Sequence, residues 1–266
     1  MIGRLLRAGE RIARSRLEVP PFHDPTHVLL ASYPKSGNTW LRFILANLSR
    51  SIGDHDLDVD FHSIGRYVPE IRRNRKLEGR IETAGFPLFL KTHFPHIPAF
   101  DRYRALVVIR DPADTLVSYH RHLSGAAGKR LPDLPRFVHH WRYGVDAWRD
   151  WYESWVDRAA HVIRYEDLLE DPVAAMRSAL GALGLSVDAE AIDIALQRSS
   201  KDRMRSAQNE RGDPNLKNRR YQFVGKARSG WSRELLDAAQ LARLYERAGE
   251  VAERFGYGAV GEAGDP

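Results

Sequence analysis

The 266-residue sequence contains no cysteine. This absence excludes disulfide bonds, thiol nucleophiles and zinc sites with cysteine ligands, and it suits a reducing compartment. The sequence also has no run of about 18 apolar residues, so we expect no transmembrane helix. The apolar stretch and the cleavage site of a secretory signal are missing from the N-terminus. Together these absences predict a cytoplasmic protein.

Positive charge is present in excess. Lysine and arginine number 41 against 35 acidic residues, which makes the formal net charge +6. A basic excess favours an anionic partner such as a nucleotide, a nucleic acid or an acidic surface. Considered alone, however, the charge is better explained by solvated, arginine-rich faces.

Residues 1–24 form a basic N-terminal segment in which arginines alternate with apolar residues. The pattern is typical of a helix that lies on an anionic membrane surface, or of a transit sequence. More often such a segment is a terminal helix that packs on its own domain or on a partner chain, and we favour that interpretation. The residues concerned are Arg4, Arg7, Arg11, Arg14 and Arg16, with Ile2, Leu5, Leu6 and Ile12.

Short apolar segments rich in β-forming residues predict four strands: Val28–Tyr33, Leu88–Thr92, Ala105–Ile109 and His161–Tyr165. The third contains a continuous apolar run rather than an alternating pattern, which is typical of a strand buried on both faces of a parallel sheet.

A helix signal follows the first, third and fourth strands. Leucine and isoleucine recur at helical spacing after the first strand. Asp111-Pro112 and Asp171-Pro172 each combine an N-cap residue with a first-turn proline, and Gly184 marks the end of the second of these helices. Repeated strand–loop–helix units predict a three-layer α/β fold with a central parallel sheet flanked by helices.

We assign residues 25–258 to one domain and 259–266 to a disordered tail. The aromatic-rich stretch Val138–Val156 is interpreted as core packing. Arg205–Arg220 is polar, basic and without clear periodicity, which predicts a loop, and the last helix is expected from about Ser232 to Phe255.

The segment Tyr33–Trp40, Y-P-K-S-G-N-T-W, joins the first strand to its helix. Backbone N–H groups at a helix N-terminus stabilise anions. Gly37 would allow close backbone approach, Lys35 would add a full charge, and Ser36 and Thr39 offer hydroxyl donors. The segment is not a Walker A loop, because lysine precedes its single glycine. It predicts a phosphate or phosphosulfate site.

His93 follows the second strand in the segment F-L-K-T-H-F-P, at the edge where a parallel sheet presents ligands. A neutral imidazole there can remove the proton of an attacking alcohol. Lys91 points to the same face, so its charge would stabilise developing negative charge and lower the pKa of His93. His55 and His96 are weaker candidates.

Arg110 ends the third strand, and Ser118 lies eight residues further along, in the following helix. A guanidinium group presents paired donors that match phosphate oxygens. The alternative is a surface ion pair between Arg110 and either Asp111 or Asp114.

In this order, the segments resemble the PAPS-dependent sulfotransferases, where PAPS is 3′-phosphoadenosine 5′-phosphosulfate. Y-P-K-S-G-N-T-W is similar to that family's Y-P-K-S-G-T-T-W loop, with Asn38 in place of threonine. The resemblance implies that Lys35 contacts the bridging oxygen and the 5′-phosphate, and that Trp40 stacks on adenine. K-T-H-x-P is similar to the family's catalytic segment, and the Arg110–Ser118 spacing to its 3′-phosphate motif.

Three further segments resemble the family more loosely. V-I-R-Y-E-D-L places Tyr165 at a nucleotide-contacting position, and S-S-K-D-R-M places Ser200 beside the adenine, with Lys201 where an aromatic residue is common. F-V-G-K-A-R-S-G-W departs from R-K-G-x-x-G-D-W but keeps Lys226, and Arg228 could supply the missing guanidinium.

The resemblance implies a P-loop-like nucleotide-binding fold, PAPS as sulfuryl donor, no metal, and a small-molecule or carbohydrate acceptor with a hydroxyl group. We expect no nucleic-acid partner. The alternatives are a P-loop-type small-molecule kinase and a non-catalytic nucleotide or polyanion binder that uses Arg205–Arg220. The sequence leaves the acceptor and the oligomeric state open.

The predicted catalytic residues are His93, Lys35 and Lys91. The predicted nucleotide-binding residues are Lys35, Ser36, Gly37, Asn38, Thr39, Trp40, Arg110, Ser118, Tyr165, Ser200, Lys226 and Arg228.

Overall fold

The computed structural model of the chain describes residues 24, 26–71, 79–214, 216, 218 and 229–258. A four-stranded sheet lies at its centre, with the strand order β2-β1-β3-β4 and every pair parallel. The strands are β1 (Val28–Ser32), β2 (Phe89–Thr92), β3 (Arg104–Ile109) and β4 (His161–Arg164). Each predicted strand is confirmed, with ends that shift by one residue at most.

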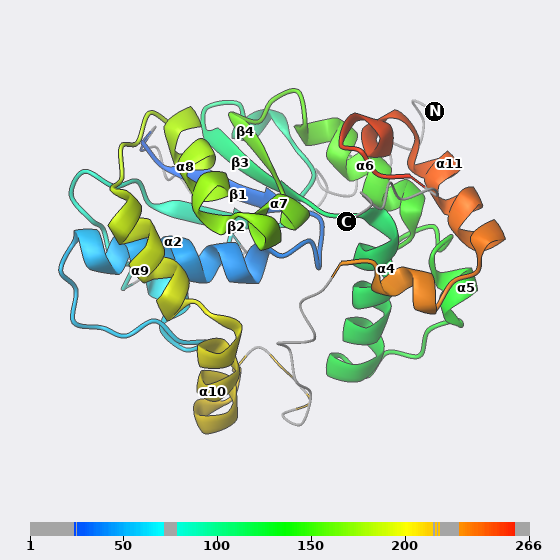
Figure 1. The fold of residues 1–266 in the computed structure, drawn as a ribbon, viewed down its shortest axis with the longest axis horizontal. Coiled ribbons are helices and arrows are strands. Elements are labelled where there is room, and N and C mark those ends of the chain that lie inside the picture. The colour runs from blue at the N-terminus through cyan, green and yellow to red at the C-terminus, as the bar shows by residue number, and fades with distance from the viewer. Residues whose placement is uncertain are drawn as a thin grey trace.

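The sheet is covered by helices on both faces, as Figure 1 shows. Side chains of β1 and β3 alternate between two cores: Leu29 and Val107 belong to one, and Leu30 and Val108 to the other. In Figure 1, α4, α6 and α11 gather on the right of the sheet, and α8 and α9 on the left. The predicted three-layer α/β fold is confirmed, and so is the prediction that β3 is buried on both faces.

The helical elements have the following bounds: α2 (Asn38–Ile52), α3 (Ile64–Tyr67), η1 (Pro98–Phe100), α4 (Pro112–Arg121), the π-helical turn η2 (His122–Ala126), α5 (Leu134–Phe137), α6 (Val145–Trp155), α7 (Tyr165–Glu170), α8 (Pro172–Ala182), α9 (Ala189–Arg198), α10 (Lys201–Arg211), the 3₁₀ turn η3 (Trp231–Glu234) and α11 (Ala238–Arg254). None of the described helices is long and apolar enough to cross a bilayer.

Both predicted N-caps are present. The Asp111 carboxylate accepts a hydrogen bond from the Asp114 amide at 2.9 Å, and the Asp171 carboxylate accepts one from the Ala174 amide at 2.9 Å. Each cap satisfies an amide that has no partner inside its helix. Gly184 has a φ of 67°, the left-handed conformation that ends α8 as predicted.

The prediction of a loop over Arg205–Arg220 is wrong for its first part, because α10 continues to Arg211. Only Met204 and Gln208, four positions apart, are buried in this helix. A buried face this narrow produces no apolar periodicity, although its Lys, Arg, Met, Ala, Gln and Glu residues favour helix formation. In Figure 1, α10 extends below the rest of the fold.

The start of the last helix is also corrected. We expected it near Ser232, but α11 begins at Ala238 after the turn η3. Asp237 is the N-cap, and it forms a capping box with Gln240 in which each side chain accepts from the other residue's amide. This reciprocal pair stops the helix from extending further toward the N-terminus.

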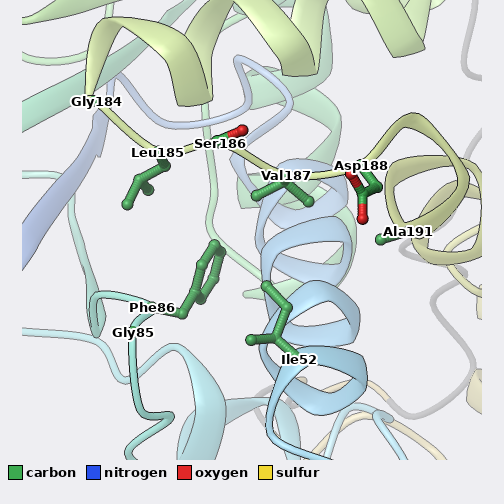
Figure 2. Close-up of a pocket in the computed structure, with 9 residues that line it drawn as sticks. All are labelled: Ile52, Gly85, Phe86, Gly184, Leu185, Ser186, Val187, Asp188 and Ala191. Carbon is green, nitrogen blue, oxygen red and sulfur yellow. The ribbon is translucent and has the colours of Figure 1, made fainter.

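A pocket lies at the end of α2 that is remote from the predicted site (Figure 2). Phe86, which precedes β2, and the 184–188 loop form much of its lining, and Ile52 closes it from the C-terminal end of α2. Because α2 has 15 residues, the pocket and the N-terminus of that helix are separated by about 22 Å along the axis. The pocket is therefore not part of the site described next.

Candidate functional site

The loop between β1 and α2 has an unusual backbone. Lys35 has a φ of 75° and Gly37 a φ of 96°, so two residues in three adopt the left-handed conformation. For lysine this conformation is uncommon and strained. Two observations explain why position 37 is a glycine. Its φ is in the left-handed region, and a Cβ atom there would lie 2.3 Å from the Tyr165 ring. The loop therefore packs directly against the residue that follows β4.

The N-terminus of α2 has the properties of an anion site. Its N-cap position is Gly37, which has no side chain to accept hydrogen bonds from the first amides of the helix. The first turn contains no acidic residue. The positive end of the helix dipole thus lacks a counter-charge from the helix itself, and an anion in front of it would be stabilised.

Lys35 adds positive charge at this point. Its side chain is half-buried, and burial together with the nearby cations Arg110 and Lys91 lowers its pKa to about 7. An anion bound beside Lys35 would favour its charged form and so offset the cost of burying that charge. The residues present therefore fit a phosphosulfate or a nucleotide with more than one phosphate.

His93 lies just beyond the end of β2 and is attached to the neighbouring strand. Its Nδ1 atom is 2.8 Å from the Ser32 carbonyl oxygen. A carbonyl can only accept, so Nδ1 carries a proton, and in the neutral ring Nε2 holds the lone pair. Burial and, second, the charge of Lys91 lower the pKa of His93 to about 3. The ring is therefore neutral near pH 7, and Nε2 is its unprotonated nitrogen.

Lys91 forms an ion pair that the sequence did not predict. Its Nζ atom is 3.2 Å from Glu70 Oε1. The backbone holds the two residues together, because the Lys91 amide donates to the Pro69 carbonyl and the Ile71 amide donates to the Lys91 carbonyl, both at 2.8 Å. Glu70 thereby offsets part of the Lys91 charge beside His93. Nothing in the local sequence around Glu70 indicates this partnership.

Two polar side chains of the β1–α2 loop point into the fold. Asn38 is 3% exposed, and its amide nitrogen donates to Ser32 Oγ at 3.0 Å. The Ser36 hydroxyl is fully buried and lies 2.8 Å from the hydroxyl of Tyr152. These side chains support the loop from beneath, so any contact that either makes with a bound anion would come from its backbone amide.

Arg110 occupies a buried position at the end of β3. Its guanidinium carbon lies 4.6 Å from the ring centroid of Tyr165, and its Nη2 atom is 3.5 Å from Asp114 Oδ2. The Asp114 carboxylate also accepts from the amides of Gly230 and Ser232, at 2.7 and 2.8 Å. The predicted pairing with Asp114 therefore exists, but inside the protein rather than on its surface. It joins Arg110 to the start of η3.

The other predicted nucleotide-binding residues that the structure describes lie on α2, α4 and α7 and at the N-cap of α10. Trp40 and Tyr165 meet edge to face, with ring centroids 6.3 Å apart. Ser118 is half-buried on α4, two turns beyond Arg110, and Thr39 is half-buried in the first turn of α2. Ser200 is the N-cap residue of α10, next to Ser199, whose hydroxyl accepts from Asn47 of α2 at 3.0 Å. Lys226 and Arg228 lie outside the described residues, as do residues 1–23 and 259–266.

His122 is a second histidine near the site that the sequence analysis missed. It begins the π-helical turn η2, four residues after Ser118. Burial and the charges of Lys35, Lys91 and Lys129 lower its pKa to about 4, so this ring is also neutral near pH 7. The i, i+4 spacing from Ser118 was the available signal, since residues four apart share a helix face. π-helical turns are frequent at functional sites.

Within the described ranges, no group of three or more histidine, aspartate or glutamate side chains could hold a metal ion. The described residues of the site thus include two neutral imidazoles, those of His93 and His122, together with two lysines and a buried arginine.

Comparisons with known proteins agree on one family. The sulfotransferase domain model matches residues 25–256. Sulfotransferase 1E1 of Cavia porcellus is 26% identical over 199 residues, which cover 68% of this chain and 67% of that protein. Sulfotransferase 1A1 of Rattus norvegicus is 27% identical over 206 residues, with the same two coverages.

Solved structures share the fold. Mouse sulfotransferase SULT7A1 complexed with PAP is 22% identical, with a TM-score of 0.64 over 87% of this chain and 84% of that one. Retinol dehydratase in complex with retinol and PAP is 18% identical, with a TM-score of 0.63 over 84% of this chain and 80% of that one. At these identities the likeness concerns the fold, and the family follows from the domain match. This chain belongs to the sulfotransferase family.

Proposed function

We propose that the protein transfers a sulfuryl group from PAPS to an acceptor hydroxyl and releases adenosine 3′,5′-bisphosphate (PAP). The observation that carries this proposal is His93. Its ring is neutral, and its Nδ1 atom is engaged by the carbonyl of Ser32, the last residue of the strand that leads into the loop before α2, so the lone pair lies on Nε2. Membership of the sulfotransferase family supports the same chemistry.

The nucleotide would lie across the C-terminal edge of the sheet, where open α/β sheets bind ligands. Its 5′-phosphosulfate would be held by Lys35 and by the first amides of α2, around Gly37. Its 3′-phosphate would be held by Arg110 and Ser118. The adenine would lie near Trp40 and Tyr165. Thr39, Ser200, Lys226 and Arg228 complete the proposed nucleotide-binding set.

The reaction requires only groups that the chain supplies besides its two substrates. As the acceptor oxygen attacks sulfur, His93 Nε2 takes the hydroxyl proton. The new O–S bond forms while the bond between sulfur and the 5′-phosphate oxygen breaks, and PAP leaves with that electron pair. Lys35 and Lys91 stabilise the negative charge on the transferring and leaving groups, since preorganised charges dominate such transfers.

The acceptor is proposed to be a hydroxyl-bearing small molecule or carbohydrate. Retinol dehydratase, which shares the fold, was crystallised with retinol and with androsterone, both of which are small molecules. We further propose that residues 25–258 form one domain, that the protein acts in the cytoplasm and that it needs neither a metal nor a nucleic-acid partner.

Calorimetry and thermal melting with PAP provide the first test. We expect binding and a rise in melting temperature with PAP, and a much smaller effect with the Lys35→Ala variant. Labelled PAPS with a panel of hydroxylated acceptors then tests the transfer itself. The absence of both heat and a melting shift with PAP would contradict the proposal, and magnesium-dependent transfer from ATP would replace it with a kinase.

A further inference from the structure

Helix α6 carries four large aromatic side chains against the sheet: Trp148, Trp151, Tyr152 and Trp155. All four are buried and belong to a single hydrophobic core, which confirms the interpretation as core packing for the α6 part of Val138–Val156. The interpretation is wrong for Trp141, which lies before α6 and is 69% exposed. Three of the four also direct a polar atom to a segment that forms the candidate site. This second property is not required for filling a core.

The two tryptophans in the C-terminal half of α6 hold the backbone at His93. The indole N–H of Trp151 donates to the His93 carbonyl at 3.0 Å, and the indole N–H of Trp155 donates to the Phe94 carbonyl at 3.0 Å. These carbonyls come directly after Thr92, the last residue of β2, where the pairing with β1 has ended. The peptide groups on the C-terminal side of the histidine are thus attached to α6 rather than to the sheet.

Tyr152 connects the same helix to two other parts of the site. Its hydroxyl lies 2.7 Å from the Val108 carbonyl and 2.8 Å from the Ser36 hydroxyl. A hydroxyl has one proton and a carbonyl can only accept, so Tyr152 donates to Val108 and accepts from Ser36. The β1–α2 loop and the end of β3 are therefore attached to the helix that holds His93.

We infer that α6 is a positioning helix, in which Trp151 and Trp155 fix the place of His93 relative to the β1–α2 loop. The inference rests on the proposed function, in which His93 is the base. The ring is already held on one side by the Ser32 carbonyl at 2.8 Å. The indole bonds hold its backbone on the other side, so the orientation of Nε2 is determined from both ends.

The size of the effect follows from the geometry of transfer. Proton transfer needs heavy atoms within hydrogen-bond reach, and a misplacement of about 1 Å can lower a rate by about 10²-fold. Removing one indole N–H leaves a carbonyl without its partner and allows the peptide group to rotate. The loss would therefore appear in kcat, whereas nucleotide binding by Lys35 and Arg110 would be retained.

The helix itself supplies a matched control. Trp148 is also fully buried, but its indole N–H has no hydrogen-bond partner in the described part of the chain. Trp151→Phe, Trp155→Phe and Trp148→Phe are thus the same chemical change at three buried positions of one helix. Only the first two changes remove a bond to the segment that carries His93.

The experiment compares kcat, KM for PAPS, PAP affinity and melting temperature for the three variants. We expect Trp151→Phe to lower kcat by about 10- to 100-fold, with KM for PAPS and PAP affinity within about twofold of wild type. Trp155→Phe should lower kcat less, and Trp148→Phe should lower only the melting temperature. Should Trp151→Phe fail to fold, Trp155→Phe against Trp148→Phe carries the same test.

A measurement independent of activity separates this inference from the proposed function. The ring ¹⁵N shifts of His93, assigned by their loss in His93→Gln, report its tautomer. We expect a single Nδ1–H tautomer in wild type and Trp148→Phe, and a mixture in Trp151→Phe. Wild-type shifts with wild-type kcat in Trp151→Phe, or an equal kcat loss in Trp148→Phe, would overturn the inference. An active His93→Gln protein would instead overturn the role of His93 as base in the proposed function.

Discussion

The two helical layers that cover the sheet differ in the side chains that they bring to it. The layer of α2, α8 and α9 packs aliphatic residues such as Leu41, Ile44 and Leu180 on one face. On the other face, the layer of α4, α6 and α11 adds the four large aromatic residues of α6 and Tyr245 of α11 to its aliphatic residues, and several of these aromatic residues also form hydrogen bonds. Tyr245 of α11, for example, donates to the carboxylate of Asp111 at 2.6 Å.

This difference separates two tasks. Aliphatic packing stabilises a fold without directing any polar group, whereas an aromatic residue with a polar atom can stabilise and orient at the same time. Substitutions of the buried aliphatic residues in the first layer should therefore change stability alone. Substitutions that reach the site through the second layer should change turnover as well.

The largest loss of turnover is expected on substitution of His93, whose carbonyl accepts a hydrogen bond from Trp151 of the second layer. His93→Ala should lower kcat by about 10²-fold or more, because a general base of this kind contributes about 10²- to 10⁴-fold. PAP affinity should change little, since the ring accepts a proton rather than binding phosphate. Steady-state kinetics and calorimetry check both expectations, and near-normal turnover with a good acceptor would contradict the role of base.

The second-largest effect is expected for Lys35, which belongs to neither layer, and it concerns the pH dependence of PAP affinity. Its pKa of about 7 would rise when an anion binds, so PAP binding should take up a proton above pH 7. PAP affinity should then fall by up to about tenfold per pH unit from pH 7 to 9, and Lys35→Ala should abolish this slope. Calorimetry in buffers of different ionisation enthalpy measures the uptake, and equal slopes in both proteins would show that another group is responsible.

A third prediction concerns the aliphatic layer. Ile44 is fully buried on α2, and Ile44→Ala should lower the free energy of unfolding by about 2–5 kcal/mol. Turnover per folded molecule should remain at the wild-type value. Urea unfolding and active-site titration measure the two quantities. A clear drop in kcat at constant folded fraction would contradict the claim that the aliphatic residues affect stability alone.

The smallest effect is expected at Asn38, which lies where the layers meet. Its amide nitrogen donates to Ser32 Oγ at 3.0 Å and to the Leu30 carbonyl at 3.4 Å, and Ser32 in turn holds His93. Asn38→Ala therefore removes two buried hydrogen bonds, each of about 1 kcal/mol. We expect kcat to fall about fivefold, with PAP affinity unchanged. Asn38→Thr, which restores the family's usual residue, should recover part of the loss. The kcat values of Asn38→Ala and Asn38→Thr test this prediction. A loss of PAP affinity in place of a loss of kcat would assign Asn38 to nucleotide binding.

The strands and the first turns of α4 and α8 could be predicted because their signals are local. Apolar runs identify β1 and β3, and an aspartate followed by proline identifies each helix start. The position of His93 beyond β2 was equally clear. What the sequence did not indicate depends on residues far apart in the chain, such as the ion pair of Glu70 with Lys91 and the hydrogen bond of Trp151 to His93.

The incorrect predictions have a physical cause of the same kind. Helix α10 was missed because helix propensity, not apolar periodicity, characterises Lys201–Arg211. The aromatic residues of α6 were correctly assigned to the core, but their polar atoms have partners that no local pattern reveals. His122 was overlooked because its significance comes from Lys35 and Lys91, on other elements.

The close fit of Gly37 against Tyr165 has a consequence for synthesis on the ribosome. The Tyr165 ring occupies the space where a side chain at position 37 would begin, so it forms one wall beside the β1–α2 loop. During translation that wall is absent until β4 and the residue after it have emerged and paired with β3. The nascent chain therefore cannot complete its nucleotide site until well over half of the polypeptide has been made.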